Sequence, residues 1–192
     1  MSRVPPPDAI LSLMLWLALW LILGGEGEAP EGRLLQLHGR GFSFEVLEPE
    51  GWVLDTESAP QIANFIFHPR GVNWRRADAV IYARFTPRRL GEPLDSFLEE
   101  NRRNFYSTCP GGADSRVEAL EAAPFQVFRF DCTGSRTELV AFAEFPGYFV
   151  IFALAGRDAA AVAPGESTLR AILQSFRWTT LPRDLFRRPA TP

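Results

Sequence analysis

The residues that could do chemistry in this 192-residue chain are few. There are only two histidines, His38 and His68. Neither has partners at the spacing of a metal site, and neither belongs to a nucleophile-elbow pattern with a serine. A catalytic histidine also needs a carboxylate to orient it, and a sequence alone cannot show one beside either ring. We therefore predict that both lie at strand ends or on the surface, and that the chain has no catalytic residue, metal or cofactor.

Two other patterns that can carry chemistry are also weak. Gly111 and Gly112 form an isolated glycine pair that precedes a predicted strand, whereas a phosphate-binding loop precedes a helix. Glu99 and Glu100 are neighbours on a charged helix face, where adjacent side chains diverge by about 100°. We expect neither a phosphate site nor a shared acid–base pair.

The segment from Phe67 to Ala77 is where we expect binding, if the chain binds through a loop. Arginine beside tryptophan is the composition of residues that anchor protein interfaces. The alternative is a solvated loop whose tryptophan packs on the core. The candidate binding residues in this segment are His68, Arg70, Trp74, Arg75 and Arg76.

The first 29 residues predict export. Arg3 precedes a predominantly apolar run of fifteen residues from Ala9 to Leu23, which is about 22 Å long as a helix. Because a hydrocarbon layer is about 30 Å thick, this length fits a secretory signal peptide better than a membrane span. An uncleaved N-terminal anchor is the alternative, and it would be the chain's only contact with a membrane. We expect a bacterial periplasmic or extracellular protein.

The cysteine count fits that compartment. Cys109 and Cys132 are the only two cysteines, and exported chains with an even number usually pair them. Their spacing is unlike that of a redox Cys-x-x-Cys motif. We predict a structural disulfide that stabilises the fold by about 3 kcal/mol.

Composition excludes one class of partner. The net charge is −3, and all twenty basic residues are arginines, so nothing suggests nucleic acid. With 46% apolar residues, one globular domain is expected. We divide the chain into the N-terminal segment 1–29, a linker 30–33, a domain 34–180 and a disordered tail 181–192.

The elements that must position these residues centre on the run from Arg136 to Ala155. It predicts a hairpin of two strands that turn at Pro146-Gly147 and are apolar on both faces. Such a hairpin must be covered from both sides. Further strands are predicted at 41–47 (an edge or half-exposed strand), 62–68, 78–85 (apolar on both faces), 115–121 and 125–132. Helices are predicted from Pro93 and over 158–176, the second interrupted at Pro164-Gly165. About seven strands and two amphipathic helices predict an α+β sandwich with a largely antiparallel sheet.

Short motifs at both ends of the domain resemble the PsbP-like superfamily. They are Phe42-Ser43-Phe44, followed by Pro49-Glu50-Gly51-Trp52, and the closing run from Ile172 to Arg177. The resemblance, which includes bacterial exported proteins of the DcrB/DUF1795 type, covers about Leu34 to Thr179. It implies an α/β/α sandwich and a non-enzymatic accessory role. No metal or partner residue of the family can be carried over to this sequence.

Together these observations predict an exported, non-catalytic binding or accessory module of the cell envelope. Its partner would be an unknown envelope protein or other component, recognised through a sheet edge or the Phe67–Ala77 loop. The alternative is a small periplasmic hydrolase or ligand carrier. A deep pocket with converging polar groups would distinguish the two.

Overall fold

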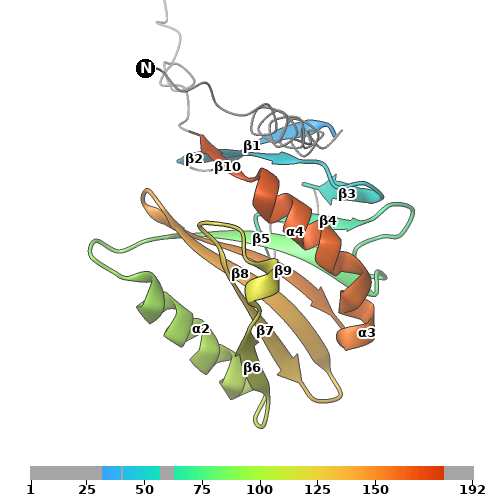
Figure 1. The fold of residues 1–192 in the computed structure, drawn as a ribbon, viewed down its shortest axis with the longest axis vertical. Helices are drawn as coiled ribbons and strands as arrows, with labels where there is room; N and C mark the ends of the chain where they lie inside the picture. The colour runs from blue at the N-terminus through green and yellow to red at the C-terminus, as the bar shows by residue number, and fades with distance from the viewer. Residues whose placement is uncertain (1–31, 40, 57–62, 180–192) are drawn as a thin grey trace, which may run out of the picture. The chain divides into compact units, whose positions relative to one another are not determined.

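Seven antiparallel strands form the main sheet of this computed structural model, which describes residues 32–39, 41–56 and 63–179. These residues fall within one compact unit that begins at Gly32. The strands lie in the spatial order β3 (Trp52–Asp55), β4 (Phe65–Pro69), β5 (Ala79–Pro87), β9 (Tyr148–Gly156), β8 (Arg136–Phe145), β7 (Gln126–Cys132) and β6 (Ala113–Arg116) (Figure 1).

The β8–β9 hairpin is buried on both faces, as the sequence predicts. Its register runs from Thr137 opposite Gly156 to Phe145 opposite Tyr148. Phe152 contributes to one hydrophobic core and Phe142 to a second core on the other side of the sheet. Alternate side chains of a strand point to opposite faces, so the apolar residues of the hairpin need cover on both.

Helix α2 (Leu94–Thr108) covers one face of the sheet. It begins after Pro93, with Asp95 in its first turn where an acidic side chain complements the helix dipole. The Phe97 ring stacks on Phe149 of β9, with centroids 4.4 Å apart. This helix therefore completes the core that contains Phe142.

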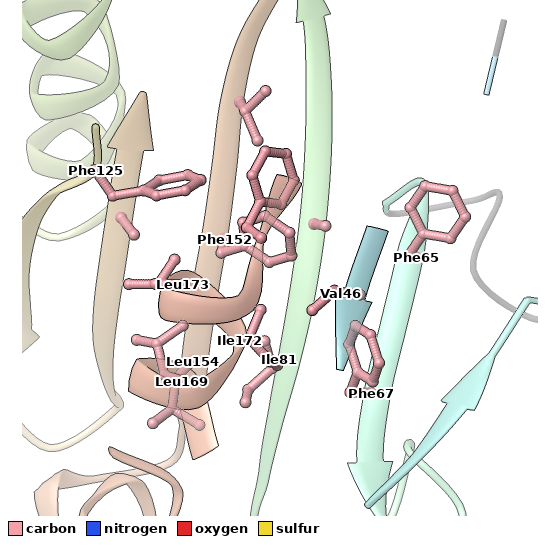
Figure 2. Close-up of a cluster of buried hydrophobic side chains, with 14 of the residues drawn as sticks. Val46, Phe65, Phe67, Ile81, Phe125, Phe152, Leu154, Leu169, Ile172 and Leu173 are labelled. Atoms are coloured by element: carbon pink, nitrogen blue, oxygen red, sulfur yellow. The ribbon is translucent and has the colours of Figure 1, made fainter. Parts of the chain in front are cut away.

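The opposite face is covered by helix α4 (Glu166–Ser175) together with a second sheet. That sheet has three antiparallel strands in the order β1 (Leu34–Gly39), β2 (Phe42–Leu47) and β10 (Arg177–Thr179). Figure 2 shows Leu169, Ile172 and Leu173 of α4 beside Phe152 in the core that they share. The α+β class and the antiparallel sheet are confirmed, with a small sheet added to one outer layer.

Several local predictions were wrong. β1, β3 and β10 were not expected, and β2 is the central strand of the small sheet rather than an edge. The predicted strand 115–121 is instead β6 followed by a short 3₁₀ turn, η2 (Glu118–Leu120). β6 is the last strand of the sheet and pairs with β7. This pairing ends at Arg116, opposite Phe128, just before the turn η2 begins.

The predicted helix 158–176 is interrupted at Pro164-Gly165, as the sequence indicates, and consists of three pieces. α3 (Ala159–Val162) and the 3₁₀ turn η3 (Ala163–Gly165) precede α4. The break lies at Pro164-Gly165, because proline has no N–H for the helix ladder. A Cβ at Gly165 would lie 2.8 Å from a Leu154 methyl group, so glycine lets this turn approach β9 closely.

Cys109 and Cys132 form the predicted disulfide, with Cα atoms 5.8 Å apart. Within residues 32–39, 41–56 and 63–179, none of the helices combines the length and the apolar character needed to cross a bilayer. The predicted signal segment 1–29 and the tail 181–192 lie outside the described residues.

Candidate functional site

A polar cavity of about 270 Å³ lies between α2 and the sheet. Its walls come from β5, β8 and α2, which meet here because Tyr82 of β5 and Val140 of β8 both pair with Ala153 of β9. The cavity is lined by Tyr82, Arg84, Asn101, Asn104, Phe105, Thr108, Phe130, Arg136, Glu138, Val140, Phe142 and Ile151.

Glu138 is the acidic group of this cavity. Its side chain is only 17% exposed, and its Oε1 lies 3.6 Å from Nε of Arg136. Burial raises the pKa of Glu138, and this effect outweighs the lowering by the Arg136 and Arg84 guanidinium groups. Glu138 is thus a carboxyl group kept partly away from water beside two positive charges.

The two arginines are held by different contacts. The Arg84 guanidinium lies over the Tyr82 ring, 5.6 Å from its centroid. Arg136 donates a hydrogen bond from Nη2 to Oγ1 of Thr108 at 3.2 Å. Burial raises the pKa of the Tyr82 phenol, so its hydroxyl stays protonated at neutral pH. The cavity therefore offers two cations and a neutral hydroxyl.

Helix α2 supplies uncharged polar groups. Asn101 donates from Nδ2 to the Phe97 carbonyl at 2.7 Å, four residues earlier in the helix, which fixes the orientation of its amide. Asn104, one turn later, lines the same cavity. The rest of the lining is apolar and comes from Phe105, Phe130, Val140, Phe142 and Ile151.

Two further hollows adjoin this cavity. One of about 250 Å³ shares Arg84, Asn101, Asn104 and Ile151 with it. The other, of about 390 Å³, shares Arg136 and Glu138. We call the three together the α2 groove. It follows β5 from Pro87 to Asp78, a length of about 30 Å at the rise of an extended strand.

The predicted loop residues are divided between different places. Trp74 and Arg75 line the 390 Å³ hollow together with Arg136, Glu138 and Arg157, so they belong to the α2 groove. The Arg75 guanidinium lies over the Trp74 ring at 5.2 Å. Arg76 instead lines a separate hollow with Trp52 and α3 residues, although it also contributes with Arg75 to a shallow one at the loop itself.

The other two loop candidates lie apart from the groove linings. Nδ1 of His68 is 3.1 Å from the carbonyl oxygen of Pro69, its neighbour in the chain. Arg70 is exposed, and its backbone N–H donates to the Gly51 carbonyl at 2.8 Å. The structure thus does not gather the five predicted residues into one site.

A serine–histidine pair occurs where the sequence analysis did not expect it. The hydroxyl of Ser43 on β2 lies 3.0 Å from Nδ1 of His38 on β1 and accepts a hydrogen bond from Thr179 at 2.8 Å. Ser43 is 1% exposed. A nucleophile must reach its substrate, and this hydroxyl instead satisfies polar groups within the small sheet.

The charged face of α2 is less solvated than expected. Arg102 donates from Nε to Oδ2 of Asp114 on β6 at 3.1 Å and pairs with Glu99 at 2.6 Å. Its guanidinium also lies over the Phe128 ring at 4.9 Å. Arg102 therefore fastens α2 to the edge of the sheet, while Glu99 and Glu100 remain exposed.

The sequence analysis missed the main cavity because it treated residues 78–85 as apolar on both sides. Tyr82 and Arg84 occupy the same face as Val80, a face that the sheet presents to α2. Glu138 of β8 lies on the same face, because it pairs with Ala155 of β9, the residue that also pairs with Val80. The available signal was a charged residue at a position that alternation assigns to a covered face.

No group of three His, Cys, Asp or Glu side chains that could hold a metal occurs among the described residues. No family model matches the sequence, and no curated protein matches it. The structure is similar to the solution structure of cyanobacterial PsbP (CyanoP) from Synechocystis sp. PCC 6803, with 14% identity and a TM-score of 0.48. The match covers 82% of this chain and 99% of that one.

Proposed function

We propose that this chain is an exported, non-catalytic binding module of the cell envelope, and that it binds through the α2 groove. The observation that carries the proposal is the 270 Å³ cavity, where Arg84, Arg136 and Glu138 converge with uncharged polar and apolar side chains in one lining. A concave site with a few converging polar groups on apolar walls is the usual form of a binding pocket. The partner is an envelope protein or another envelope component.

A ligand carrier in the same compartment is the second candidate. The central cavity, at about 270 Å³, is slightly smaller than a typical site for a drug-sized molecule, so a carrier would hold a smaller ligand. The two candidates differ in whether the bound species is a small molecule held in that cavity or a protein that lies along the whole groove.

Charge reversal in the groove tests the proposal. The unchanged full chain should retain bound small molecules or proteins during purification from an envelope extract. The variants Arg84→Glu and Arg136→Glu should each lose them. Arg170→Glu on α4, in the opposite layer, is the control and should retain them. Native mass spectrometry identifies retained small molecules, and peptide mass spectrometry identifies retained proteins. If all three variants retain the same species, the groove is not the binding site.

Neighbouring arginines in the loop provide a finer test. Arg75 lines the α2 groove beside Glu138, whereas Arg76 lines the hollow on the α3 side. Arg75→Glu should therefore weaken retention more than Arg76→Glu. Equal losses would place the contact on the outer loop rather than in the groove.

Export has a separate test. Bacterial alkaline phosphatase is active only after export, because its disulfides form outside the cytoplasm. A fusion of residues 1–33 to the phosphatase should be active, and the same fusion with Leu17→Arg, which places a charge in the apolar run, should not be. An inactive unchanged fusion would contradict export.

A further inference from the structure

We propose that the central cavity of the α2 groove binds a carboxylate attached to a small apolar group, with Arg84 and Arg136 as the groups that contact the carboxylate. This inference rests on the proposed function and specifies the chemistry of what is bound. The same chemistry could come from a free organic acid or from the C-terminal residue of a peptide, and the experiment below separates these sources.

The charges in the cavity favour a single negative charge on the ligand. Two arginines and one glutamate give the site a formal charge of +1 when Glu138 is ionised. One carboxylate would neutralise that excess. Guanidinium groups bind carboxylates with paired, charge-assisted hydrogen bonds, which are about twice as strong as neutral ones.

The rest of the lining favours an apolar group on the ligand. Phe105, Phe130, Val140, Phe142 and Ile151 contribute to the lining, and all five are part of the core beneath α2. A phenyl or branched aliphatic group placed there would leave water for an apolar surface. Asn104, Thr108 and Tyr82 supply uncharged polar groups to the same lining.

Glu138 makes the expected binding sensitive to pH. Its negative charge lies where it opposes a second anion, so an ionised Glu138 weakens carboxylate binding and a protonated one does not. The charged or titratable groups that face it are Arg84 and Tyr82 from β5, Arg136 from β8, and Arg75, Asp78 and Arg157 across the adjoining hollow. Arg157 is already paired with Asp78 at 3.3 Å, and α2 contributes no charged side chain to the central cavity.

Calorimetric titration of the full chain at pH 7 with 3-phenylpropanoate tests this inference, with neutral 3-phenylpropanamide as the matched probe. The acid should bind at least about tenfold more tightly than the amide, the worth of one charge-assisted hydrogen bond. Arg84→Gln and Arg136→Gln should each remove most of that difference, and Arg170→Gln should leave it unchanged. Equal binding of acid and amide would overturn the inference, as would no binding of either together with no binding of the free peptide described below.

Glu138→Gln gives the opposite and more specific result. It should tighten binding of the acid severalfold at pH 7 and should remove the gain in affinity that the unchanged chain shows as the pH falls toward 5. Weaker binding by this variant would overturn the inference, because the carboxylate would then not be repelled by Glu138. The unfolding midpoint of Arg84→Gln shows whether that variant folds. If it does not, Arg84→Lys, which keeps the positive charge, replaces it.

Two peptides identify the source of the carboxylate. Acetyl-Ala-Ala-Phe with a free C-terminus and its C-terminal amide differ only in the charged group. If the free peptide binds more tightly than 3-phenylpropanoate, the site takes a peptide end; if it does not bind and the free acid does, the site takes small acids. Should all probes fail while the charge-reversed groove still loses its envelope partner, the proposed function stands and this inference alone is wrong.

Discussion

Cys109, the residue that ends α2, is disulfide-bonded to Cys132, the last residue of β7. The bond links the C-terminal end of α2, which lines the cavity, to the sheet on which α2 packs. Because 23 positions separate the two cysteines, loop closure is expected to stabilise the fold by about 3 kcal/mol.

Replacement of both cysteines by serine should therefore lower the free energy of unfolding by about 3 kcal/mol, measured by urea denaturation. The oxidised protein should also show no free thiol when it is titrated unfolded. Two thiols per chain, or an unchanged denaturation midpoint, would contradict the prediction. Ser107→Ala, an exposed change near the end of α2, is the control.

Truncation of an aromatic residue on either face of β9 should be about equally damaging. Phe149 is 1% exposed and packs under α2, while Phe152 is 0% exposed and packs under α4. Phe149→Ala and Phe152→Ala should each cost about 3–5 kcal/mol of unfolding free energy. Leu90→Ala, at a residue fully exposed in a loop, should change it by less than about 0.5 kcal/mol. A small effect at Phe149 would mean that α2 does not cover that face.

Glu138 should make the protein less stable as the pH rises. Its pKa in the folded protein is above the ordinary value of 4.5, so between these two values the folded state holds a proton that the unfolded state has lost. Stability is therefore lost as the pH rises from 4.5 through the folded-state pKa. Glu138→Gln should flatten this part of the pH profile and should be more stable than the unchanged chain above it.

Glu121 is the matched control for that measurement, because the Arg116 guanidinium lowers its pKa. Its contribution has the opposite sign: it is present above 4.5 and lost as the pH falls through the lowered value. Glu121→Gln should thus be no more stable than the unchanged chain at neutral pH. Identical pH profiles for the two variants would contradict both assignments.

Ser43 should prove structural. Ser43→Ala removes the acceptor of the Thr179 hydroxyl and the partner of His38, so it should cost about 1–2 kcal/mol of unfolding free energy. Thr86→Ala, at a half-buried position of β5, is the control for loss of a hydroxyl from a strand. Retention by the groove should be unaffected by Ser43→Ala, and a loss of retention without a loss of stability would contradict a structural role.

The hairpin and both covered faces could be predicted because alternating apolar residues leave few other arrangements. The three-stranded sheet could not, because β10 pairs with β2 across most of the chain and is only three residues long. Local pattern carries no information about such distant pairing. The short strand β3 was not predicted because a turn signal, Pro49-Glu50-Gly51, comes immediately before it.

The sequence indicated only the residues at one end of the α2 groove. Trp74 and Arg75 were expected to bind and do line the groove, but the central residues were overlooked. Arg84 and Glu138 are 54 positions apart, and only the pairing of β5, β9 and β8 brings them to one cavity. Whether a charged strand residue is covered by a helix depends on where that helix ends, which the sequence does not state.

The small sheet has a consequence for the order in which the chain can complete its fold. β1 and β2 are the first described strands, but β2 gains its second neighbour only from Arg177–Thr179, the last described strand. A chain that emerges N-terminus first from a ribosome or a membrane pore must hold Phe44 and Val46 without their final cover until almost all of it has appeared. The small sheet therefore cannot be completed before Arg177–Thr179 are available, whatever the rest of the chain has already formed.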